Sequence, residues 1–348
     1  MKITINYYTR MKKYLLIAAT ACLALAACTK NEVKPVSTDQ EITFETISTK
    51  ATEVYSKLNI FKTWAYMHTA DYAASIDKQL YLGGTDGLVI SYVPASSQWK
   101  NATSTYYWPK NGDKLTFFSY ATNSNTCSLS GATVKCDFEN GIIVEGFATD
   151  SNLDVDFLVA DVAKNMTANA DPVTYHYVGV PTLFRHKLSN VIFTINSKEN
   201  YDKKTFKLQS IDLVNVTATA NYIQNPLNPT YEGWNGISLH NVTYCNTETL
   251  FDKTVLIPTA LQSYYIPQTF DNSTKVILKY TITTNNGESD PSNYAVENVV
   301  VEKKLSELFG ASWKMGTRYT CAITVSLDEI LWDPAVEPWV DEYHTLPI

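Results

Sequence analysis

The sequence lacks the short motifs that mark many enzymes and cofactor-binding proteins. It contains no GxSxG, no phosphate-binding P-loop and no GxGxxG. Its five histidines form no HxxxH pair and its six cysteines form no CxxC pair, so neither a metal site nor a redox site is predicted. Asp154 and Asp156 would share one face of a strand, but such a pair is more often solvated than catalytic. We therefore expect no catalytic residue, no cofactor and no metal, in a protein that is not an enzyme.

A run of basic residues is also missing. The chain has 28 Lys and Arg against 35 Asp and Glu, and its formal net charge is -7. Four of the basic residues and none of the acidic ones precede Cys28, so the remainder is more acidic still. Nucleic acid is not expected as a partner, because binding to phosphates needs clustered positive charge.

The N-terminal region has no apolar run of the roughly 20 residues that a membrane-spanning helix needs. A shorter apolar run, Tyr14 to Leu25, follows Met11-Lys12-Lys13 and leads into Leu25-Ala26-Ala27-Cys28. A basic start, an apolar run, small residues and a cysteine together indicate a lipoprotein signal peptide over residues 1–27. Cys28 would then be the lipidated first residue, followed by a polar tether over residues 28–40. An ordinary signal peptide with a chance cysteine is the alternative.

The composition beyond the tether favours strands. There are 23 Tyr, 13 Gly and 13 Pro among 348 residues, and β-branched residues are frequent. Alternating patterns predict a first strand at Glu41–Glu45, a bulged strand or strand pair over 206–216, and a long final strand from Tyr319. Asn111-Gly112 and Asn286-Gly287 are favoured hairpin turns between such segments. We therefore predict an all-β fold, with a domain boundary between Asp161 and Phe184.

The cysteines and tryptophans allow more than one interpretation. Export permits disulfides, and Cys127 and Cys136 lie nine apart across Ser-Gly-Ala, which suits a bridge across a hairpin. Cys321 alternates with apolar residues and is expected to be a buried thiol. The aromatic residues fit the core of a β-sandwich, but they could also form a platform for sugars. The tryptophans considered for that platform are Trp64, Trp99, Trp108 and Trp234.

Several of these segments occur together in a recognisable order. They are the cysteine motif, Ile42-Thr43-Phe44, Tyr107-Trp108-Pro109 through Phe117-Phe118-Ser119-Tyr120, Phe184-Arg185-His186-Lys187-Leu188-Ser189, Ile266-Pro267-Gln268, and Trp313 to Tyr319 before the last long strand. In this order and spacing, over nearly the whole mature chain, the sequence resembles the fimbrillin family of Bacteroidia, the subunits of type V pili and their relatives.

The resemblance implies two transthyretin-like β-sandwich domains after the signal peptide, at residues 41–183 and 184–348. It also implies export as a lipoprotein, tethered to the outer membrane through the lipid on Cys28 and displayed at the cell surface or in a pilus. The implied partners are other pilin subunits, together with host or bacterial surface ligands in cell adhesion. A glycan-binding surface lipoprotein of a polysaccharide-uptake system is the alternative function.

The resemblance further implies assembly by donor-strand exchange. A trypsin-like protease would cut between Lys50 and Ala51 and remove the first strand, here Ile42, Thr43 and Phe44. The family's usual residue at the cut is arginine, and lysine stands here. The implied donor strand of the next subunit is formed by Ile330, Leu331, Trp332, Val336, Trp339 and Val340. Pro334 and Pro338 interrupt it, so it would pair fully on one side only. Shaft, tip and anchor roles all fit these residues.

Overall fold

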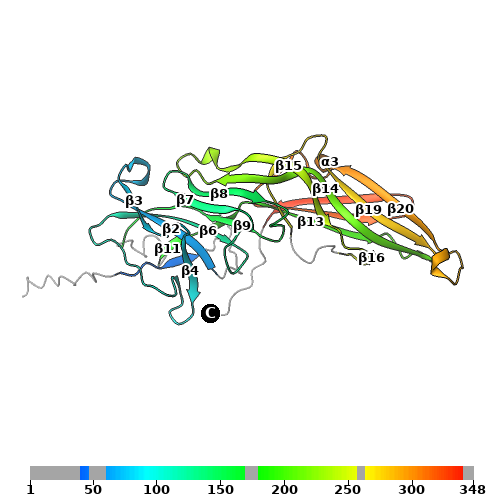
Figure 1. Ribbon diagram of the computed structural model, residues 1–348, viewed down its shortest axis with the longest axis horizontal. Coiled ribbons are helices and arrows are strands. Elements are labelled where there is room, and N and C mark those ends of the chain that lie inside the picture. Colours follow the sequence, from blue (N-terminus) through cyan, green and yellow to red (C-terminus); the bar gives the residue numbers. More distant parts are fainter. Residues whose placement is uncertain (1–39, 47–59, 169–178, 257–262, 340–348) are drawn as a thin grey trace, which may run out of the picture. The chain divides into compact units, whose positions relative to one another are not determined.

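The computed structural model describes residues 40–46, 60–168, 179–256 and 263–339 (Figure 1). Strands make up almost all of the regular secondary structure of these residues, so the predicted all-β fold is confirmed. The described helical elements are α3 (Leu305–Phe309) and the short turns η1 (Tyr72–Ala74), η2 (Pro229–Tyr231) and η3 (Pro291–Asn293). No helix in the described ranges has the length and apolar character to cross a membrane.

The first sheet has ten strands, and its main path runs β11-β1-β5-β4-β2-β6-β9-β12, with β3 on β2 and β10 on β6. Its strands are β1 (Phe44–Thr46), β2 (Ile60–His68), β3 (Lys78–Leu82), β4 (Leu88–Val93), β5 (Gln98–Lys100), β6 (Lys114–Thr122), β9 (Phe157–Ala160), β10 (Ala163–Met166), β11 (Val180–Thr182) and β12 (Phe184–His186).

Both faces of this sheet are covered, which explains why β6 is buried without a break from Leu115 to Thr122. Leu115 and Phe117 face a cluster that also contains Phe61, whereas Phe118 and Tyr120 face a second cluster. Successive side chains of a strand point to opposite faces, so a strand buried on both sides carries no polar alternation. We call the cluster around Phe61 and Phe117 the first-strand core, because Ile42 and Phe44 belong to it.

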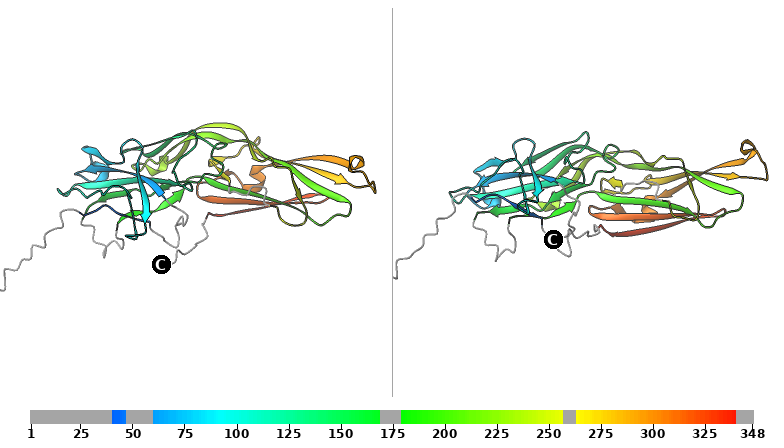
Figure 2. Two further views of the ribbon diagram at one scale, coloured as in Figure 1. Left: turned by 60° about the horizontal axis from the view of Figure 1, so that its bottom comes forward. Right: turned by 90° about the horizontal axis from the view of Figure 1, so that it is seen from below.

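Two further sheets stack on each other (Figure 2). The larger runs β20-β19-β14-β8-β7, with β15 and β16 also on β14, and the smaller runs β17-β13-β22-β23. The strands of the larger sheet are β7 (Thr133–Asp137), β8 (Gly141–Ala148), β14 (Lys204–Ile223), β15 (Gly233–Cys245), β16 (Thr249–Phe251), β19 (Lys275–Thr284) and β20 (Ala295–Lys304). Those of the smaller sheet are β13 (Ser189–Ser197), β17 (Ser263–Tyr265), β22 (Thr317–Val325) and β23 (Ile330–Pro338). A separate pair joins β18 (Gln268–Thr269) and β21 (Ser312–Trp313).

The 20-residue strand β14 contributes to two cores. Its apolar residues follow a period of two, with jumps of three at 208–211 and 213–216, and register shifts interrupt its pairing at both places. A bulge inserts one residue and so returns the next side chains to the buried face. Phe206 to Ala218 therefore line the core between the two stacked sheets, and Ala220 and Tyr222 line the second cluster. This confirms a bulged strand over residues 206–216.

The strands on either side of the predicted domain boundary pair with each other. β14 pairs with β8, and β9 pairs with β12, so hydrogen bonds join residues before and after 183/184. Residues 41–348 also belong to one compact unit. The division into domains at 41–183 and 184–348 stays a prediction.

The two Asn-Gly turns have different outcomes. β19 and β20 pair along ten residues on either side of Asn286-Gly287, as expected. The prediction of a hairpin at Asn111-Gly112 is wrong. Gly112 has a positive φ of 81°, but β6 pairs with β2, β9 and β10, while Tyr107 forms a bridge with Glu41. The local turn forms, but β6 pairs with strands that are distant in the sequence, because these bury more of its apolar surface.

Candidate functional site

The first strand lies between two other strands at one end of the ten-stranded path. Phe44 pairs with Val180 of β11 on one side and with Trp99 of β5 on the other. Outside these ladders, the Ile42 amide donates to the Tyr106 carbonyl at 2.8 Å, and the Val180 amide donates to the Thr43 carbonyl at 2.8 Å. The predicted strand at 42–44 is therefore present, although its regular part, β1, begins at Phe44. Removing it would expose two strand edges that face each other.

The floor of this site is apolar. Ile42 and Phe44 are each only 4% exposed, and the Phe44 ring lies edge-on to Phe61 and Phe117, with centroids 5.4 and 5.6 Å away. Trp108 packs against Phe117 in the same first-strand core. Burial of an isoleucine and a phenylalanine stabilises by about 1.5–3 kcal/mol each. An empty site would expose this floor to water and would favour any strand that covers it again.

Gly179 permits the close approach of the first strand. A Cβ at this position would lie 2.9 Å from the Thr43 carbonyl oxygen and 3.0 Å from the carbonyl carbon of Phe44. Every other described glycine has a positive φ, and Gly179 does not, so its role is to leave space. No local pattern in the sequence marks this residue. An isolated glycine before a short strand signals close backbone approach only when its neighbour is known.

The C-terminal strand is held differently. β23 pairs antiparallel with β22 along all nine of its residues, from Val325–Ile330 to Thr317–Pro338. Proline has no amide hydrogen, so Pro334 and Pro338 fit an edge strand with their nitrogens turned away from β22. Leu331 and Val336 are 60% and 52% exposed, while Ile330 and Trp332 pack against the core between the stacked sheets. The segment predicted as a donor strand is thus folded onto its own chain up to Trp339.

Trp339 ends this segment in a buried position. It is 0% exposed, and its ring stacks on His186 at 3.6 Å and 17°, and on Tyr264 at 5.1 Å and 20°. The Trp339 amide donates to the Gly316 carbonyl at 3.2 Å. Within the described residues its Nε1 has no hydrogen-bond partner, which offsets the gain from stacking by about 1–3 kcal/mol. Trp339 is therefore a strong but incompletely satisfied anchor for β23.

The basic segment beside Trp339 is neutralised by acidic side chains from three places. Arg185 donates from Nε and Nη2 to both carboxylate oxygens of Asp161 at 2.8 Å, and this contact raises the pKa of the guanidinium. His186 Nδ1 lies 2.8 Å from Asp156 Oδ2, in a buried pair. Lys187 Nζ donates to Glu232 Oε1 at 2.6 Å. His186 is a packed histidine. Asp154 is exposed and Asp156 is buried, so the two form no catalytic pair.

The predicted disulfide between Cys127 and Cys136 is wrong. Both residues are free thiols. Cys127 lies in the connection between β6 and β7 with its Sγ 3.4 Å from the Ile60 carbonyl, whereas Cys136 lies within β7, which pairs with β8. The two do not face each other across a hairpin. Burial raises the pKa of Cys127 to about 11 and that of Cys321 to about 12, and Cys321 is the buried core thiol that was expected.

Of the other predicted site residues, some lie outside the described ranges and the others are buried or half-buried. Cys28, Lys50, Ala51 and Val340 lie outside the described residues. Trp64 and Trp108 are buried, while Trp99 and Trp234 are half-buried and pack on neighbouring rings. These four tryptophans therefore do not form an exposed platform. The described residues hold no group of three or more His, Cys, Asp or Glu side chains that could bind a metal ion.

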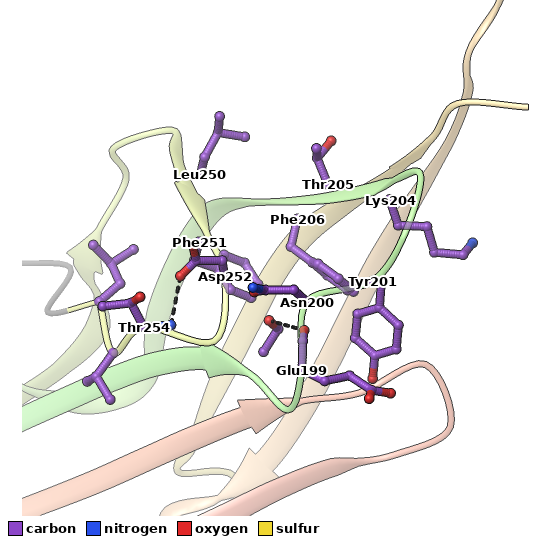
Figure 3. A pocket seen from close by; sticks show the side chains of 13 residues that line it. Glu199, Asn200, Tyr201, Lys204, Thr205, Phe206, Leu250, Phe251, Asp252 and Thr254 are labelled. Carbon is purple, nitrogen blue, oxygen red and sulfur yellow. Dashed lines mark hydrogen bonds between the residues drawn. The ribbon is translucent and has the colours of Figure 1, made fainter. Parts of the chain in front are cut away.

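A cavity of about 520 Å³ opens where β13 ends and β14 begins (Figure 3). The rings of Phe206, Phe251 and Tyr201 lie along it, with neighbouring centroids 5.5 Å apart. Asn200 and Asp252 are among its polar residues, and the Thr254 amide donates to Asp252 at 2.7 Å and lowers the pKa of that carboxyl. No sequence motif marks this cavity, because its residues come from separate segments of the chain.

Comparisons with known proteins relate the chain to fimbrial proteins. A family model described as fimbrillin-like matches residues 49–339. A fimbrial protein from Bacteroides vulgatus has a similar structure, with a TM-score of 0.56 and 15% identity, over 86% of this chain and 99% of that one. A candidate cell adhesion protein from Bacteroides uniformis has a TM-score of 0.49 and 15% identity, over 86% and 98%. No relative is found among curated proteins. The first of these structures supports the fold.

Changing Gly179→Ala should loosen the first strand. The added methyl group meets the backbone at Thr43 and Phe44, and overpacking of this kind costs about 1–3 kcal/mol. Hydrogen exchange should become faster at the Val180 amide, which bonds to Thr43. Gly131→Ala is the control, because it introduces strain at a positive φ with open space around it and lies outside the β1 site. Equal exchange at Val180 in both variants would contradict the role assigned to Gly179.

Removing the Trp339 ring should free the C-terminal strand. Trp339→Ala should lower the free energy of unfolding by about 3–5 kcal/mol, as for other buried aromatic residues, and should speed amide exchange in β23. Trp339→Phe keeps a ring and removes the unpartnered N–H, so its loss should be much smaller. Urea unfolding and hydrogen exchange measure the two effects. Unchanged exchange in β23 after Trp339→Ala would show that the ladder with β22 alone holds the strand.

Proposed function

Because the chain belongs to the fimbrillin-like family, we propose that it is a structural subunit, or a tip or anchor protein, of a type V pilus that supports cell adhesion. The proposed partners are other pilin subunits. The proposed route is export as a lipoprotein with its lipid on Cys28, followed by display at the outer membrane or in the pilus.

We propose that assembly proceeds by donor-strand exchange. The observation that supports this is the site of the first strand, in which Ile42 and Phe44 belong to an apolar floor between two strand edges. Cleavage after Lys50 would separate this strand, and its lipid, from the rest of the chain. A replacement strand would regain main-chain hydrogen bonds from β5 and β11, and its alternate side chains would fill the places of Ile42 and Phe44.

The proposed donor is the segment from Ile330 to Val340 of a neighbouring subunit. The contacts of β23 set the condition for this role, because the strand must first leave β22 and withdraw Trp339 from His186 and Tyr264. Pro334 and Pro338 leave two gaps on one side of the donor ladder, so it would bond fully to one edge of the acceptor. A subunit that keeps β23 in place would instead end a polymer, as a tip or an anchor would.

Blocking the cut should block assembly. We expect a trypsin-like protease to release a fragment ending at Lys50 from the precursor, and we expect Lys50→Gln to prevent this release and the ladders of polymers that follow on gels. Lys110→Gln, at an exposed lysine in a turn, is the control and should leave both unchanged. Mass spectrometry identifies the fragment. A Lys50→Gln chain that still polymerises would contradict removal of the strand at this bond.

A glycan-binding surface lipoprotein is a second candidate function, and the cavity beside Tyr201 favours it (Figure 3). Its volume of about 520 Å³ and its aromatic and amide side chains suit a sugar unit, which has apolar faces and hydroxyl groups. Titration with a panel of neutral oligosaccharides tests this function. Tyr201→Ala should weaken binding about tenfold or more, which is the loss of about 1.4 kcal/mol. Tyr231→Ala, at a 69% exposed tyrosine outside the cavity, should not. No binding to any member of the panel would exclude it.

A further inference from the structure

β20 is an edge strand of unusual length. It pairs with β19 along ten residues, from Lys304–Lys275 to Ala295–Thr284, with no shift in register. In the described part of the chain, no strand pairs with its other side, and Figure 1 shows it at the margin of the seven-stranded sheet. Its outer edge therefore offers a continuous row of backbone donors and acceptors.

This edge is poorly protected against pairing. Folded proteins commonly shield such edges with prolines, bulges, short strands or charged side chains. The charged residues of β20 all lie outside its central valines, Val299 to Val301. β23 carries two prolines, whereas β20 has none and no bulge. Val296 and Val300 are also 61% and 60% exposed, on the face opposite to Val299, which packs on the core. A long, regular edge with exposed valines is suited to a partner strand.

We propose that β20 pairs in antiparallel fashion with β20 of a second copy of this chain. Only every second residue of β20 directs its backbone N–H and C=O groups to the free edge. Two identical strands therefore form hydrogen bonds only when odd-numbered residues stand opposite odd-numbered ones and even-numbered opposite even-numbered ones. The twofold axis (dyad) of the pair then lies between one residue and the same residue of the other copy. For the middle of the strand, that residue is Val299, Val300 or Val301.

Charge selects among these three registers. With the dyad at Val300, Glu297 of each copy faces Lys303 of the other, and Val299 faces Val301. The dyad at Val299 places Glu297 opposite Val301, and the dyad at Val301 places Lys303 opposite Val299, so neither forms these ion pairs. Opposite charges directly across a ladder stabilise it. The proposed register is therefore the one centred on Val300.

The side chains concerned are available for this pairing. Glu297 takes part in no ion pair among the described residues, and Lys303 has a partly exposed partner, Glu307, at 2.9 Å within its own chain. Neither β1 nor Trp339 is involved, because they belong to other sheets or clusters. The contact therefore does not depend on the proposed strand exchange, and each can fail alone.

Sedimentation of the purified full chain over a concentration series tests the proposal. We expect a reversible dimer, and Val300→Lys should raise its dissociation constant at least tenfold because two lysines would meet at the dyad. Ile237→Lys is the control, at a 51% exposed residue of β15 in the same sheet, and should leave the constant unchanged. Hydrogen exchange in β20 should slow as the concentration rises.

A charge swap tests the register itself. Glu297→Lys and Lys303→Glu should each weaken the dimer, and the double variant should restore it to within about threefold of the original constant. A chain that stays monomeric throughout the series would overturn the proposal. A dimer that Val300→Lys leaves intact, or that the double variant fails to restore, would overturn this edge or this register.

Discussion

The hydrogen-bond ladders of β14 are the constraint on which most of the structure depends. This strand bonds to β8, β15, β16 and β19, and its side chains enter two cores. Register shifts at 208–211 and 213–216 keep its apolar residues on the buried side along the first of these cores. Loss of its register would turn those residues toward water and would remove the support of β8 and β19 together.

The two ends of the described chain are held in contrasting ways. The first strand has few backbone bonds, and its side chains and the space left by Gly179 secure it. The C-terminal strand has a ladder of nine residues, but most of its side chains are exposed until Trp339. On the proposed route, the short first strand would separate once it is cut from the chain, whereas the long ladder of β23 would hold until Trp339 is withdrawn.

Four strand edges bear on the proposed association, and their chemistry differs. The edges of β5 and β11 are already occupied by β1. The outer edge of β23 is interrupted by Pro334 and Pro338, which cannot donate a backbone hydrogen bond. Among the described residues, the outer edge of β20 has neither a proline nor a covering strand. In a β-protein, proline or a covering strand closes an edge to pairing, and an edge without them stays open. The choice of open edges directs the contacts of the protein.

The sequence alone determined the local features of this protein. Period-two patterns identified the first strand, the segment 206–216 as a bulged strand or strand pair, and the buried Cys321, because a strand's alternation is set by its own residues. An Asn-Gly turn indicated the β19–β20 pair. The order of its motifs indicated the family. Tertiary structure decided the partners. Tyr107 pairs with Glu41 across the sheet, Cys127 and Cys136 lie on elements that do not face each other, and Gly179 and Trp339 act through residues far away in the chain. Such pairings depend on which distant surfaces bury the most apolar area, and no local pattern encodes that choice.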